Sequence, residues 1–141
     1  MSTQASSPDQ SAAQHSRDAR RDPNSVVWKG GFYQFKNSGS LEPISTEHEM
    51  VSALWIYPYK GHTNGVPIDN AGNVSIGVSN SGPTVMTDIL APGDTPDGSS
   101  PSYLKFSAPL GKDGTQKHID VADIVGRADT AGDGVYWIGH E

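Results

Sequence analysis

Glycine and proline interrupt this sequence at short intervals. The 141 residues include 16 Gly and 10 Pro, and no long run is rich in the helix formers Ala, Leu, Glu and Lys. Glycine and proline favour turns, and both weaken a helix when they lie in its interior. The chain therefore predicts an all-β domain of many short strands joined by turns, without a long helix.

The apolar segments between these turns have the length of strands. Residues 49–59 form the most apolar of them, and the period of two along a strand predicts that Trp55 and Tyr57 share one face. Pro58 suits the end of that strand or an edge position, because proline cannot donate a ladder hydrogen bond.

Two other segments are less regular. In the strand expected at 26–35, the pair Gly30 and Gly31 indicates a bulge or a bend. Residues 117–125 fit either a strand or a helical turn, because apolar residues recur there at both spacings.

Residues 26–141 are expected to form one domain of seven or eight strands. Strands of this number pack as two sheets, in a jelly roll or in an immunoglobulin-like sandwich. The loop at 91–101 suits a strand that crosses between sheets better than it suits a simple meander. We therefore predict a jelly-roll-like two-sheet sandwich of about eight short antiparallel strands.

Residues 1–25 differ from the rest of the chain. They contain no aromatic and no branched aliphatic residue, so they cannot bury enough apolar surface to offset the entropy of ordering them. We expect a flexible polar arm in front of the domain. In one interpretation the arm has no role, and in the other it orders on a neighbouring subunit through Arg17, Arg20 and Arg21.

Charge and composition exclude several classes of partner and site. The formal net charge of −6 argues against nucleic acid and against anionic lipid, since both attract basic surfaces. The sequence has no cysteine, which excludes disulfides, thiolate metal sites and cysteine nucleophiles. No apolar run approaches the roughly 18 residues of a membrane-spanning helix. We therefore expect neither a nucleic-acid nor a membrane partner.

Motifs for catalysis are missing from the sequence. It contains no GxSxG, GxGxxG or GxxxxGK[ST], and its five histidines form no HxH or HxxxH pair. We therefore predict a non-enzymatic protein with no catalytic residue, no cofactor and no metal. Asp94, Asp97, Asp129 and Asp133 lie in glycine-containing loops, and we interpret them as turn residues, with calcium binding as the alternative.

Aromatic residues gather before residue 60. The favoured interpretation is that most of them fill the core between the sheets, and the alternatives are an assembly interface or a platform for sugars. Our candidate partner-binding residues are Trp28, Phe32 and Tyr59, together with the three arginines of the arm. The seven aromatic residues are Trp28, Phe32, Tyr33, Phe35, Trp55, Tyr57 and Tyr59.

Strand and turn motifs follow one another in a recognisable order through the last two-thirds of the chain. An apolar strand at 51–57 precedes an Asn/Gly turn and a V-x-I-G strand at 70–77, and an A-P-G turn lies at 91–93. Within 119–138, I-D-V-A-D-I precedes a G-D-G-V turn and an aromatic final strand. With a polar arm in front, this pattern resembles the capsid decoration, or cement, proteins of tailed bacteriophages.

The resemblance implies a structural protein of the virion that lies on the outer surface of the capsid. Its implied partners are the major capsid protein, whose neighbouring capsomers it would clamp, and further copies of itself, with a homodimer expected in preference to a homotrimer. The family has no catalytic residues to transfer. The alternative is a carbohydrate-binding or receptor-binding β-sandwich module of a phage tail or fibre.

Overall fold

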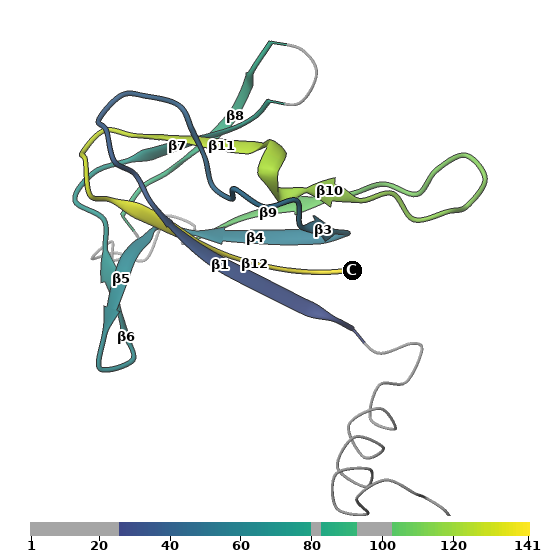
Figure 1. Cartoon of the computed structure of the whole chain (residues 1–141), viewed down its shortest axis with the longest axis horizontal. Coiled ribbons are helices and arrows are strands. Elements are labelled where there is room, and N and C mark those ends of the chain that lie inside the picture. The colour runs from purple at the N-terminus through teal and green to yellow at the C-terminus, as the bar shows by residue number, and fades with distance from the viewer. Residues whose placement is uncertain (1–25, 80–82, 93–102) are drawn as a thin grey trace, which may run out of the picture.

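The computed structural model describes residues 26–79, 83–92 and 103–141, and these residues form an all-β fold (Figure 1). The one short helical element among them is the 3-10 turn Val121–Asp123. Within these ranges, no helix has the length and apolar character needed to cross a membrane. The predicted all-β class is confirmed, whereas the arm at 1–25 lies outside the described residues.

Two four-stranded antiparallel sheets make up the body of the fold. The first sheet contains, in spatial order, β1 (Trp28–Gln34), β12 (Gly134–His140), β4 (Ala53–Tyr57) and β9 (Leu104–Ser107). The second contains β2 (Glu42–Pro43), β11 (Ile124–Ala128), β7 (Val74–Val78) and β8 (Val85–Leu90). Two smaller pairs are β3 (Met50–Val51) with β10 (Ile119–Asp120), and β5 (Tyr59–Thr63) with β6 (Val66–Asp69).

The strand order is that of a jelly roll. When the eight strands of the two large sheets are numbered in chain order, the sheets have the orders 1-8-3-6 and 2-7-4-5. Two Greek keys wound in this way define the jelly roll, so the predicted topology is confirmed. The β5–β6 hairpin is an addition to it, inserted between β4 and β7 (Figure 1).

The hydrophobic core lies between the two sheets. Alternate residues of each strand point inward, so that Leu54 and Ile56 on β4 are buried while Trp55 between them is only partly buried. Val74 and Ile76 contribute in the same way from β7. Full burial of such a side chain stabilises the fold by about 1.5–3 kcal/mol.

Gly30 and Gly31 lie in a strand that has no bulge. The pairing of β1 with β12 runs without a break in register, so the bulge that was one of the two predicted alternatives is absent. The reason is packing, because a Cβ atom on Gly31 would lie 2.6 Å from Nε1 of the buried Trp137. Pro58 directly follows β4, as predicted. Residues 117–125 contain both a short strand and a helical turn, so each alternative was correct in part.

The interpretation that most of the early aromatic residues fill the core is wrong. Phe35 is buried, and Tyr33 packs against the core. The other five occupy the opposite, outward side of the first sheet or the hairpin beside it. Alternation along a strand separates two faces, and here the smaller aliphatic residues take the inner face.

Candidate functional site

A row of aromatic side chains crosses the outward face of the first sheet. Phe32 on β1 is paired with Tyr136 on β12, and Tyr136 is paired with Tyr57 on β4. Directly opposed residues project to the same face, and the ring centroids of Phe32 and Tyr136 are 4.5 Å apart. Tyr103 lies just before β9, with its ring centroid 5.8 Å from that of Tyr57. We call Phe32, Tyr136, Tyr57 and Tyr103 the aromatic row.

A second aromatic group lies on the same outward face, nearer the start of β1. The ring centroid of Trp28 is 5.9 Å from that of Trp55 and 5.1 Å from that of His140. The amino group of Lys105 lies 5.2 Å from the Trp55 ring centroid, which is the geometry of a cation–π contact. Trp28 is 55% exposed, so this end of the face is open to solvent.

The β5–β6 hairpin stands beside the aromatic row, and a β-bulge sets which way its side chains point. Lys60 is one extra residue in β5 relative to β6. In a regular strand, Tyr59 and His62 would point to opposite sides because three positions separate them. The bulge brings both onto the same side. The His62 ring centroid lies 4.5 Å from that of Tyr136, and the Tyr59 ring is nearly parallel to that of Tyr57, at an angle of 6°.

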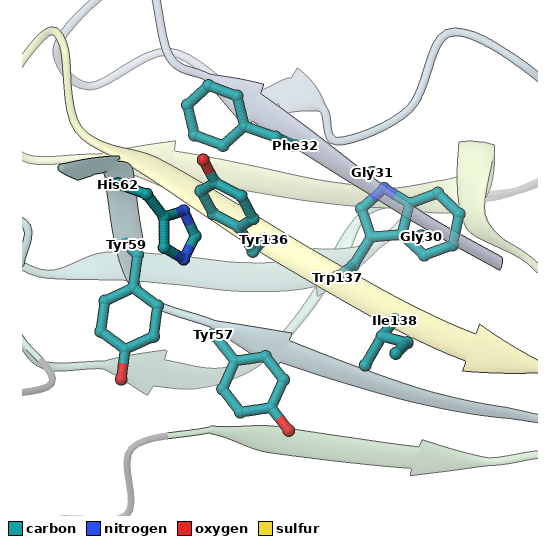
Figure 2. Close-up of a pocket in the computed structure, with 9 residues that line it drawn as sticks. All are labelled: Gly30, Gly31, Phe32, Tyr57, Tyr59, His62, Tyr136, Trp137 and Ile138. Carbon is teal, nitrogen blue, oxygen red and sulfur yellow. The ribbon is translucent and has the colours of Figure 1, made fainter. Parts of the chain in front are cut away.

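An open hollow of about 650 Å³ lies between the aromatic row and the hairpin (Figure 2). Its size is in the range of small-molecule and peptide sites. Gly30 helps to form it, because this outward position of β1 lacks a side chain. We call the hollow the aromatic corner. It is lined by Gly30, Gly31, Phe32, Tyr57, Tyr59, His62, Tyr136, Trp137 and Ile138.

Two buried polar residues hold the base of the hairpin against the start of β12. The carboxamide of Asn70 donates to the Gly134 carbonyl oxygen at 2.8 Å and accepts from the Gly134 N–H at 2.9 Å. The Asp133 carboxylate accepts from the main-chain N–H groups of Ala71 and Gly72, both at 2.9 Å. These bonds fix the wall of the aromatic corner relative to its floor.

The aromatic corner is lined mainly by aromatic ring surface. Among the described residues its lining carries no carboxylate and no carboxamide, and its polar side-chain groups are tyrosine hydroxyls and the His62 ring, since the Trp137 indole packs in the core. Within the described ranges, no group of three or more His, Asp or Glu side chains is placed to hold a metal. The corner therefore offers apolar ring surface with a few hydrogen-bond donors.

The titratable groups with shifted pKa values lie outside the aromatic corner. Burial alone would raise the pKa of Glu42, but hydrogen bonds from the Tyr33 hydroxyl and two main-chain amides outweigh it and hold that pKa below its ordinary value. Burial, with the adjacent Glu42 carboxylate, raises the pKa of Tyr33 to about 12. A hydrogen bond to Asp120 raises the pKa of His48. These pairs stabilise the fold.

The structure brings two of the predicted partner-binding residues together. Phe32 and Tyr59 both line the aromatic corner, while Trp28 lies in the second aromatic group of the same face. Their role in binding stays a prediction. The arginines Arg17, Arg20 and Arg21 lie outside the described residues.

Sequence reasoning missed three residues of the site. Tyr136 and Tyr103 lie far from the early aromatic cluster in the chain, although the alternation in the final strand was a usable signal for Tyr136. His62 lies close to Tyr59 in the sequence, but its direction depends on the bulge at Lys60. Of the loop aspartates, Asp133 uses both carboxylate oxygens in main-chain hydrogen bonds, which is a turn role. Asp94 and Asp97 lie outside the described residues.

Comparisons of the chain with protein-family models, curated proteins and solved structures gave no match.

Proposed function

We propose that this chain is a non-enzymatic structural protein that binds the outside of a tailed-phage capsid and stabilises contacts between capsomers. The observation that carries the proposal is the outward face of the first sheet. The aromatic row and the second aromatic group, which contains Trp28, both lie on this face. Contiguous exposed apolar surfaces of this kind mark interaction sites. Tyrosine, tryptophan and phenylalanine are enriched in protein interfaces and dominate their binding energy.

The location of the charge supports a basic partner surface. Residues 1–25 hold three arginines and three aspartates, so the net charge of −6 belongs to residues 26–141. Charge complementarity across an interface mainly increases the association rate and sets register, while buried aromatic contacts slow dissociation. The sequence resemblance to cement proteins supplies the identity of the partner, the major capsid protein. A cement protein stabilises the shell by binding only its assembled form.

Sedimentation with preformed phage capsids tests this proposal. We expect the full chain to co-sediment with capsids, and Phe32→Ala to weaken that binding by about tenfold or more, since central aromatic residues of an interface cost about 2 kcal/mol or more when truncated. Leu110→Ala is the matched control, because Leu110 is an exposed apolar residue in the loop after β9 and lies outside the aromatic face. Absence of co-sedimentation, or equal binding by both variants, would contradict the proposal.

A further inference from the structure

We propose that the aromatic corner binds an extended, proline-rich segment of the partner protein. This inference rests on the proposed function, because it names the part of the partner that the aromatic face would engage. The occupant is a peptide in the polyproline II conformation, a mode of recognition that uses aromatic-lined grooves.

The hydrogen-bonding groups of the corner favour this occupant. Its side chains supply the hydroxyl groups of Tyr57, Tyr59 and Tyr136 and a ring N–H of His62, and the described lining has no carboxylate or carboxamide to accept in return. A sugar presents many hydroxyl donors, for which the side chains of the corner offer as acceptors only tyrosine oxygens and one ring nitrogen of His62. A proline-rich segment presents main-chain carbonyl acceptors, and its prolines have no N–H. The donors of the corner therefore match a proline-rich peptide better than a saccharide.

The shape of the corner also fits an extended peptide. Within the corner, the aromatic row crosses the three strands β1, β12 and β4, which lie about 4.8 Å apart, so this part of the row is about 10 Å long. A polyproline II helix rises about 3.1 Å per residue, so about three residues span that length. The hairpin residues Tyr59 and His62 form a wall along one side. A wall and a floor make a groove that holds a rod-like ligand, whereas a stacked sugar needs a flat platform.

The corner is rigid before any ligand binds. The Tyr136 ring lies between two other rings, with centroid distances of 4.5 Å to Phe32 and 4.5 Å to His62. Asn70 and Asp133 fix the hairpin at its base. A polyproline II peptide is also largely ordered when free. Binding therefore orders few groups on either side, which lowers its entropic cost.

Nuclear magnetic resonance of the full chain provides the test. The probes are an oligoproline of about ten residues, a Gly-Ser peptide of the same length and a linear malto-oligosaccharide. We expect oligoproline to shift the ring signals of Tyr57, Tyr59 and Tyr136, with no comparable shifts from the other two probes. Shifts in these signals from the saccharide alone, or none from oligoproline, would overturn the proposal.

Hydroxyl deletions provide a matched comparison that keeps every ring in place. Tyr136→Phe and Tyr59→Phe remove a donor from the corner, and each should weaken oligoproline binding by about 3- to 10-fold. Tyr103→Phe removes the same group from a tyrosine of the aromatic row that does not line the corner, and it should leave the affinity unchanged. If all three variants bound oligoproline as tightly as the native chain does, the hydroxyl donors would play no part in binding, and the proposal would be overturned.

Capsid sedimentation in the presence of oligoproline separates this inference from the proposed function. Capsid binding that persists at saturating oligoproline shows that the corner does not hold the partner; the inference then fails and the capsid role stands. Oligoproline binding in the corner without capsid binding has the reverse meaning: the proline-rich site stands and the capsid role fails.

Discussion

Asn70 and Gly134, 64 residues apart in the chain, exchange two hydrogen bonds through the Asn70 carboxamide. Asn70 directly follows the β5–β6 hairpin, and Gly134 is the first residue of β12, the strand that contributes Tyr136 to the aromatic row. The two residues thus link the wall of the aromatic corner to its floor. Because Asn70 is buried, water does not compete readily for these bonds.

Replacement of Asn70 by alanine should destabilise the fold. Asn70→Ala leaves the N–H and the carbonyl of Gly134 without their partner, and each such buried group costs about 1–3 kcal/mol. Urea unfolding should show a lower free energy of unfolding for Asn70→Ala than for Asn37→Ala, whose side chain is exposed. Equal losses in the two variants would mean that the Asn70 bonds contribute nothing to stability.

Gly31 should not tolerate a side chain. In Gly31→Ala the new Cβ would lie 2.6 Å from Nε1 of Trp137, which forces a shift in the core, and overpacking of this kind costs about 1–3 kcal/mol. Gly61→Ala is the control, since its Cβ would meet Ile68 at an ordinary contact distance of 3.7 Å. Thermal unfolding, followed by tryptophan fluorescence, should give a lower Tm for Gly31→Ala only. A Tm equal to that of the control would contradict the close packing of Trp137 under β1.

Acid should destabilise the protein partly through Glu42. Its pKa is lower in the folded than in the unfolded chain, so its contribution is present above about pH 4.3 and is lost as the pH falls through the folded pKa. Glu42→Gln lacks this contribution at every pH. The free energy of unfolding of the native protein should therefore fall more steeply between neutral and acidic pH than that of the variant. Parallel pH profiles would rule out this role.

His48 should titrate above its ordinary value because it is hydrogen-bonded to Asp120. A raised pKa means that its contribution to stability is present below about pH 6.5 and is lost as the pH rises through the folded pKa. Asp120→Asn should lower the pKa of His48 toward its ordinary value in a nuclear magnetic resonance titration. An unchanged His48 pKa would contradict the pairing.

Much of the fold was predictable because turns and alternation are local properties of the sequence. The period of two correctly placed Trp55 and Tyr57 on one face. It does not say which face meets the other sheet, and that choice depends on Leu54 and Ile56, which pack in the core. This is why the aromatic residues were assigned to the wrong side.

The aromatic corner was not predictable in the same way. It combines β1, β4, β12 and the hairpin, so it depends on strand order and register, which no single segment encodes. The bulge at Lys60 sets the direction of His62, and a bulge leaves little trace in a short polar strand. Tyr59 alone was identified in this hairpin, from its place in the aromatic cluster.

The release of DNA from capsids tests the central claim most directly. The temperature at which filled capsids release their DNA would be measured for bare capsids and for capsids saturated with this protein. A cement protein binds only the assembled shell and therefore raises the release temperature. We expect a higher threshold for capsids carrying the native chain, and a threshold close to that of bare capsids when Phe32→Ala is added at the same concentration. Equal thresholds for saturated and bare capsids would contradict the cement role.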